Sequence, residues 1–298
     1  MERNKIYFSI IIPTFNRARL IHNTIKSILD QRNILFELII VDDGSEDNTS
    51  ELILGLNDDR VKYVKTANRE RGAARNSGLQ VSKGVYVNYF DSDDILNPCL
   101  LDLYTFIVNN NSPDVVHGLM ENISDEGSVI GIVRPAYSTF KKSILYNNFL
   151  ACGSVFIKRE IAHAFQFSED RRLSGTEDWE LWLRLYSNHD FIECPIVFFK
   201  QRQHALRSLH QVPTDRVTER ESVFIGHINK ERALLSKRFS KAEIDLLVAD
   251  RYTLIALSQF EAGCKSKAFN YLIKSLNSSL LVIKRKRFLA VLKKLVSD

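Results

Sequence analysis

Asp91 and Asp93 are separated by a single residue, and their type and spacing could do chemistry. They follow an apolar run that is typical of a buried strand. Alternate residues of an extended segment point to the same side, so both carboxylates would lie on one face. Carboxylate oxygens bind Mg²⁺ or Mn²⁺, and such an ion neutralises a diphosphate. The pair alone is not decisive, because aspartates in turns more often form caps or Asx-turns. Asp94, the next residue, is expected to cap the following helix.

Two earlier apolar runs are also followed by polar residues, at 13–17 and 42–45. Ligands of open α/β sheets bind at the carboxyl ends of the strands, so the three polar clusters would meet at one edge. The sequence has neither a G-x-G-x-x-G dinucleotide fingerprint nor a G-x-x-x-x-G-K-[ST] P-loop. The alternative is a divalent cation that is held by carboxylates and in turn neutralises a diphosphate.

The elements that would position these residues alternate between strand and helix. Apolar runs rich in β-branched and aromatic residues predict strands at 8–12, 36–41, 61–64 and 85–90. Apolar residues at helical spacing predict helices at 20–29 and 52–56 between them. This βαβαβ pattern predicts a mostly parallel sheet with helices on both faces.

The later elements are less regular. We expect a helix at 100–108, strands at 115–119, 155–157 and 197–200, a hairpin turn at 124–127 and a helix around 179–185. The stretch 129–150 predicts irregular structure that lines a second pocket. From Val217 onward the pattern is helical, and 256–276 predicts one antiparallel helix pair rather than a repeat array.

Composition and charge narrow the class of protein. The 298 residues are 45% hydrophobic and 26% charged, which is typical of a globular chain. No apolar run approaches the roughly 18 residues of a membrane span, and no secretory signal is visible, so a cytoplasmic location is expected. The four cysteines have no metal or disulfide spacing. From Asp215 onward 17 basic residues face 9 acidic ones, against 24 and 27 before it, so this part is expected to meet an anionic partner.

Five segments together resemble a known family, the inverting, metal-dependent glycosyltransferases of family two with the GT-A fold. They are 10–17 (IIIPTFNR), 41–49 (VDDGSEDNT), 71–78 (RGAARNSG), 91–94 (DSDD) and 177–180 (EDWE). The resemblance covers roughly residues 7–208. It implies an α/β GT-A domain over 1–210, with a basic C-terminal helical region over 211–298.

The resemblance also implies roles for single residues. Pro13, Thr14 and Asn16 would line the nucleotide pocket, and Asp43 would hydrogen-bond the base or its ribose. Arg75 would lie near the nucleotide or pair with a nearby carboxylate. Asp91 would contact the ribose or water on the metal, Mn²⁺ or Mg²⁺, and Asp93 would bind that metal directly.

A carboxylate base must take the proton of the attacking hydroxyl. The family's match is Asp178, and Glu177 is the fallback, although acids are also favoured at a helix N-terminus. A single base with a metal implies direct displacement with inversion. His204, with Arg202 and Ser208 around it, resembles a family motif in which the histidine reaches the metal or diphosphate.

The expected partners are a nucleotide-sugar donor, a UDP-sugar, and a glycan or lipid-linked acceptor. Two other classes stay open. A nucleotidyltransferase would need a Gly-rich basic first loop, which Pro13–Asn16 does not supply. A non-catalytic membrane-binding protein would rest on the basic helix at 284–295, which also allows peripheral binding to an anionic membrane by an enzyme. Nucleic acid is not expected, because the cluster has only Phe288 as an aromatic residue.

Overall fold

The computed structural model describes residues 6–203 and 212–297, which form two compact units. The first unit comprises Met1–Arg171 and His189–Arg207, and the second comprises Arg172–Asn188 and Ser208–Asp298. The sequence places the domain boundary at 210/211, close to the last of the three points at which the chain passes from one unit to the other, between Arg207 and Ser208. The segment Arg172–Asn188, however, groups with the C-terminal helices.

The first unit begins with the predicted βαβαβ pattern. Strands β1, β2, β3 and β4 pair in parallel in the order β3-β2-β1-β4. They span Phe8–Thr14, Phe36–Asp42, Val61–Lys65 and Tyr86–Tyr89, and the helices between them are α1 (Ala18–Leu29), α2 (Thr49–Leu54) and α3 (Arg71–Gln80). The prediction for this half of the sheet is confirmed.

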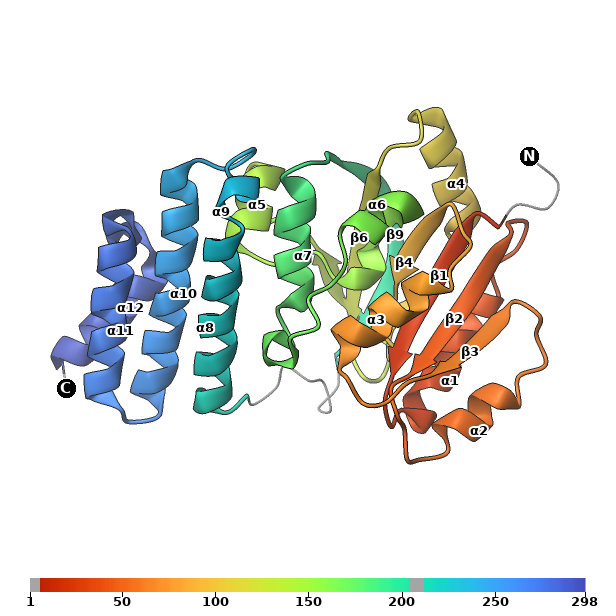
Figure 1. Ribbon diagram of the computed structural model, residues 1–298, viewed down its shortest axis with the longest axis horizontal. Helices are drawn as coiled ribbons and strands as arrows, with labels where there is room; N and C mark the ends of the chain where they lie inside the picture. Colours follow the sequence, from red (N-terminus) through yellow and green to blue (C-terminus); the bar gives the residue numbers. More distant parts are fainter. Residues whose placement is uncertain (1–5, 204–211, 298) are drawn as a thin grey trace. The chain divides into compact units, whose positions relative to one another are not determined.

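The alternation of side chains in β1 explains how helices cover both faces of this sheet. Ile10 and Ile12 share a buried cluster with the α1 stripe of Ile21, Ile25 and Ile28. Ile11 points to the opposite face, where a Cβ on Gly78 of α3 would come within 2.4 Å of its Cγ2. Gly78 therefore lets α3 pack closely on the sheet, on the face opposite α1, as Figure 1 shows.

The rest of the first unit extends the sheet with both strand directions. The full path is β3-β2-β1-β4-β8-β6-β9-β5, and β7 pairs with β6. Beyond β4 only β6 and β9 are parallel, and the other pairs are antiparallel. The sheet is therefore mixed. The added elements are β5 (Ile95–Leu96), α4 (Leu100–Asn109), β6 (Val115–Ile123), β7 (Val129–Val133), α5 (Phe140–Tyr146), β8 (Val155–Lys158), α6 (Arg159–Ala164) and β9 (Phe191–Arg202).

The expectation of irregular structure at 129–150 is wrong. The turn predicted at 124–127 is present, with Gly127 donating its N–H to the Ser124 carbonyl at 3.0 Å, and β7 returns along β6 from it. Helix α5 then begins at a cap in which the Thr139 hydroxyl accepts the N–H of Lys142. The apolar residues of β7 are largely exposed, so the segment lacks the buried pattern that signals a strand.

The second unit is helical, as predicted. It contains α7 (Glu177–Tyr186), α8 (Thr214–Lys230), α9 (Arg232–Leu235), α10 (Lys241–Glu261), α11 (Lys265–Ser278) and α12 (Lys286–Ser297). Ser240 and Glu243 form a capping box that fixes the start of α10. Helices α10 and α11 are the predicted pair, joined by a loop of three residues in which Gly263 has a positive φ. No helix among the described residues is long and apolar enough to cross a membrane.

Candidate active site

The loops after β1 and β2 are tied together by Asn16. Its backbone has a positive φ of 52°, and its N–H donates to the Ser45 hydroxyl at 2.9 Å. Its side-chain oxygen accepts the N–H groups of Glu46 (2.9 Å) and Asp47 (3.4 Å). Asn16 therefore brings the two polar clusters to one edge. Pro13 and Thr14, the last two residues of β1, lie beside it in sequence.

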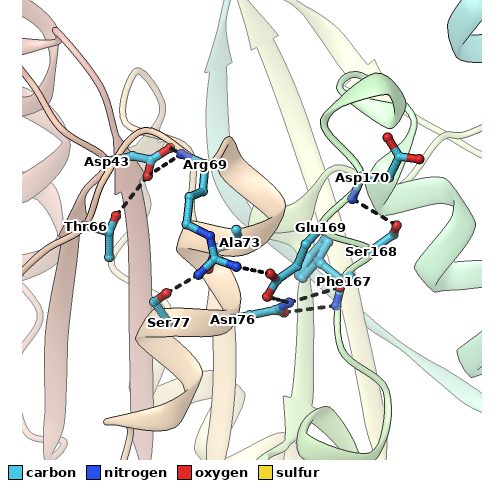
Figure 2. A network of polar contacts seen from close by, with 10 residues as sticks. All are labelled: Asp43, Thr66, Arg69, Ala73, Asn76, Ser77, Phe167, Ser168, Glu169 and Asp170. Atoms are coloured by element: carbon cyan, nitrogen blue, oxygen red, sulfur yellow. Dashed lines mark hydrogen bonds and ion pairs between the residues drawn. The ribbon is translucent and has the colours of Figure 1, made fainter.

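Asp43, just after β2, is buried and holds the loop that leads into α3. Figure 2 shows its carboxylate accepting the Thr66 hydroxyl at 2.9 Å and the Arg69 N–H, which lies 3.0 Å from each oxygen. Preceding Asp42 accepts the Tyr63 hydroxyl at 2.7 Å, and burial together with this carboxylate raises the pKa of Tyr63 to about 12. Asp43, which is predicted to hydrogen-bond the base or its ribose, is therefore held in place by Thr66 and Arg69.

The same loop is fastened to a distant segment by a network that sequence reasoning missed. The Arg69 guanidinium pairs with Glu169. The Asn76 amide donates to the Phe167 carbonyl (3.0 Å) and to Glu169 (3.1 Å), and its oxygen accepts the Phe167 N–H at 3.0 Å. The available signal in the sequence was Asn76 itself, because asparagine side chains tend to form hydrogen bonds with backbone groups. Its partners, about 90 residues away, carry no pattern.

Arg75 pairs with a carboxylate, which was one of the two roles expected for it. It is buried in α3, and its Nη2 donates to Asp91 Oδ1 at 2.9 Å. Its guanidinium also lies over the Phe167 ring, 4.9 Å from the centroid. A buried cation of this kind is stabilised by its carboxylate partner, and it orients Asp91.

The aspartate pair lies in a turn rather than in an extended segment. Strand β4 ends at Tyr89, and the N–H of Asp94 donates to the Asp91 carbonyl at 3.4 Å. The argument from alternating side chains is therefore wrong here. The Thr24 hydroxyl of α1 donates to the carbonyls of Ser92 (3.0 Å) and Asp94 (2.8 Å), which fixes the turn.

The cap predicted for Asp94 is also wrong. Strand β5 follows the turn, and α4 begins only at Leu100, with Cys99 in the capping position. Asp94 is buried instead.

Two carboxylates of this turn have the chemistry of a hard-cation site. The Asp91 and Asp93 side chains are 29% and 15% exposed, and Asp93 lies 3.9 Å from Arg17 Nη1. Within the described ranges no group of three or more His, Cys, Asp and Glu residues could hold a metal. His204, the third expected ligand, lies outside the described residues, as does Ser208. The two aspartates thus fit an ion that takes its other ligands from phosphate or water.

The two predicted base candidates start α7 in the second unit, whereas the other described candidates belong to the first. Glu177 is buried and accepts the N–H of Gly175 at 2.6 Å. Asp178 is only half-buried and accepts the Trp179 N–H at 2.7 Å. Both are favoured by the helix dipole, but Asp178 is the more accessible carboxylate.

Helix α7 is anchored to α8 and α10 directly behind these acids. The Trp179 ring stacks on Phe224 with centroids 4.9 Å apart, and the Arg251 guanidinium lies over it. Burial alone would raise the pKa of Glu180, but hydrogen bonds from His227 and Arg184 hold that pKa below its usual value. The start of α7 is therefore held by packing and charge together.

Known proteins resemble this chain in sequence. The family model for glycosyl transferase family 2 matches residues 9–164. The chain is 31% identical over 198 residues to UDP-Glc:alpha-D-GlcNAc-diphosphoundecaprenol beta-1,3-glucosyltransferase WfgD of Escherichia coli, covering 65% of this chain and 76% of that protein. It is 32% identical to the GalNAc(5)-diNAcBac-PP-undecaprenol beta-1,3-glucosyltransferase of Campylobacter jejuni, covering 61% and 60%. Two uncharacterised Rickettsia relatives are longer, and the chain spans only 30% and 21% of them.

Solved structures share the fold. Staphylococcus aureus TarS 1-349 in complex with UDP-GlcNAc has a TM-score of 0.70 at 19% identity, over 98% of this chain and 89% of that one. Mannosyltransferase PcManGT of Pyrobaculum calidifontis, in complex with GDP-Man and Mn²⁺, has a TM-score of 0.58 at 16% identity, over 98% and 88%. The fold is GT-A with a C-terminal helical region. From the match over more than half of its length, the chain belongs to glycosyl transferase family 2.

Proposed function

We propose that this protein transfers a sugar from a UDP-sugar to a hydroxyl of a lipid-linked or glycan acceptor, with inversion at the anomeric carbon. The observation that carries the proposal is the edge of the sheet where Asn16, Asp43 and the Asp91–Asp93 turn are held by bonds to their own neighbours. The E. coli and C. jejuni relatives, named for lipid-linked acceptors, and the TarS complex with UDP-GlcNAc support the substrate classes.

Donor binding would use the first unit. Pro13, Thr14 and Asn16 would border the nucleotide, and Asp43, already aligned by Thr66 and Arg69, would accept the N–H of a uracil or a ribose hydroxyl. A preorganised acceptor of this kind discriminates against a base without the matching donor. Arg75 would act through Asp91, which it orients.

Asp93 would bind a divalent cation directly, and Asp91 would contact the ribose or water on that ion. Mn²⁺ or Mg²⁺, when bound, would neutralise the charge of the diphosphate leaving group. Arg17, 3.9 Å from Asp93, is a second positive charge at the same turn. His204 remains a proposed further ligand.

Asp178 would be the general base. As the acceptor oxygen forms its bond to the anomeric carbon, its proton passes to the Asp178 carboxylate, and the bond from that carbon to the diphosphate breaks with its electrons leaving on UDP. One displacement inverts the configuration. Glu177 is the poorer candidate, because it is buried, whereas Asp178 is only half-buried.

The reaction is tested with purified full-length chain, Mn²⁺, a panel of UDP-sugars and an undecaprenyl-diphosphate-linked sugar. We expect one donor to release UDP and to leave its sugar on the lipid. A nucleotidyltransferase would instead release diphosphate from UTP and a sugar phosphate, and a binding protein would release nothing. Either result would overturn the proposal. The proposed location is the cytoplasmic side, where nucleotide sugars are found.

A further inference from the structure

Helix α12 carries two adjacent apolar stripes, and only one of them is buried. Phe288 and Val291 are fully buried against α10 and α11, and Leu295 packs against the same cluster. One position further along, Leu289, Leu292 and Val296 repeat the same spacing but are 52%, 40% and 79% exposed. The first stripe holds the helix on its unit, and the second has no cover among the described residues.

Other apolar side chains of the same unit are also exposed, on the two elements α11 and the 3-10 segment that contact α12. Leu280, Leu281 and Ile283 of the 3-10 segment Leu280–Lys284 are exposed, as are Phe269 and Ile273, which lie four residues apart on α11. Figure 1 shows α10, α11 and α12 packed side by side in this unit. We call these residues of α11, the 3-10 segment and α12 the C-terminal surface.

The C-terminal surface is also strongly cationic. Between Ala262 and Ser297 the sequence has nine Lys and Arg residues and no Asp or Glu. Some are engaged inside the unit: Arg287 pairs with Asp250 at 2.8 Å, and Lys294 lies over the Phe260 ring. Lys286 and Lys293 are exposed, make no ion pair among the described residues, and each precedes an exposed apolar residue by three positions.

We propose that the C-terminal surface docks on an anionic lipid bilayer. Exposed leucines flanked by lysines are the features of a helix that lies in the membrane interface, with apolar side chains below the headgroups and ammonium groups among them. A second copy of the chain is disfavoured, because two surfaces without a single acid would repel each other. A nucleic acid is also disfavoured, because it would not contact the exposed leucines through apolar groups. The C-terminal surface offers one exposed aromatic residue, Phe269, on which a base could stack.

Flotation of the full-length chain with vesicles tests the proposal, which does not depend on the sugar-transfer reaction. Vesicles of phosphatidylcholine alone are compared with vesicles that also contain phosphatidylglycerol, at an ionic strength on the order of 0.05 M, where charges act over more than about 10 Å. We expect co-flotation with the anionic vesicles only. We also expect it to weaken as salt is added.

Two double variants separate the charge from the apolar contribution. Lys286→Ala with Lys293→Ala should weaken binding by about fivefold per lysine, or roughly 25-fold in all. Leu289→Ser with Leu292→Ser should weaken it by at least about tenfold. The controls are Lys230→Ala with Lys241→Ala, exposed lysines of the same unit, and Leu54→Ser with Val108→Ser in the first unit; both should bind like the native chain.

The outcomes decide the proposal in either direction. Loss of flotation in both test pairs, with native circular dichroism and native controls, supports it. No flotation of the native chain at low salt, or equal loss in test and control variants, overturns it. A concentration-dependent dimer that only the leucine pair abolishes, or tight binding to RNA without vesicle binding, assigns the surface to another partner and also overturns it.

Discussion

At the residue scale, the proposed metal chemistry depends on Asp93. Its carboxylate faces Arg17 across 3.9 Å and would be the direct ligand of the cation. Replacing it by alanine should lower donor turnover by about two orders of magnitude or more, since the leaving diphosphate loses its counter-charge. Isothermal titration should also show that UDP affinity no longer depends on added Mn²⁺.

The control for Asp93→Ala is Asp59→Ala, an exposed aspartate of the same unit with no proposed role. Both variants should unfold like the native chain. If Asp93→Ala keeps its Mn²⁺-dependent UDP affinity, the assignment of the metal ligand is wrong.

The buried His117 leads to a separate prediction, which concerns the pH dependence of stability. It is buried in β6 beside Phe140 and Phe149, and burial lowers its pKa from 6.5 to about 4. The unfolded chain therefore binds a proton before the folded chain does as the pH falls. Above pH 6.5 the imidazole is neutral in both states, and the free energy of unfolding is at its full value. It decreases as the pH falls from 6.5 to about 4. The total decrease is about 3 kcal/mol.

Urea unfolding at a series of pH values checks this prediction. His117→Phe should flatten the slope between pH 6.5 and 4, whereas His22→Gln, a change at an exposed histidine, should leave it unchanged. An equal slope in native chain and His117→Phe would show that another group titrates.

At the scale of elements, the asparagine of α3 joins the nucleotide loop to the segment 167–169. Asn76→Ala removes bonds to the Phe167 backbone and to Glu169 and leaves buried polar groups without their partner. We expect a loss of about 1–3 kcal/mol in the free energy of unfolding. Ser77→Ala, next in the helix, removes only a hydroxyl bond to its own turn and should cost under about 0.5 kcal/mol.

Chemical denaturation measures both variants. UDP affinity should fall with Asn76→Ala as well, because Arg69, Glu169 and Asp43 belong to the same network (Figure 2). Equal stability of the two variants would mean that the network does not anchor the loop.

The elements differ in how far the sequence predicts them. The first strands were predictable because they are buried on both faces and continuous in apolar residues. Strand β7 was missed because Val129, Ile130 and Ile132 are exposed, so no burial pattern marks them. The sequence predicts an extended segment at Asp91, whereas the structure has a turn there, because hydrogen bonds from the Thr24 hydroxyl of α1, far away in sequence, fix its conformation.

At the scale of the whole molecule, the proposed functional residues are distributed over the two compact units. The first carries the residues assigned to the nucleotide and the cation, and the second carries the proposed base and the C-terminal surface. The uneven charge of the chain indicated a basic C-terminal part from sequence alone. Which leucines of α12 are exposed was not predictable, because Leu289 and Leu295 belong to two stripes of equal hydrophobicity that only packing distinguishes.

The most direct test of the account is the rate of sugar transfer by Asp178→Asn, measured with UDP affinity in the same preparation. Asparagine keeps the shape and can still accept the Trp179 N–H, but it cannot take the proton. We predict that transfer falls by about 10² to 10⁴ while UDP affinity is unchanged, because a general base acts only in the chemical step. Glu177→Gln should reduce transfer much less. Near-native transfer by Asp178→Asn, or a loss of UDP affinity that accounts for its defect, would contradict the account.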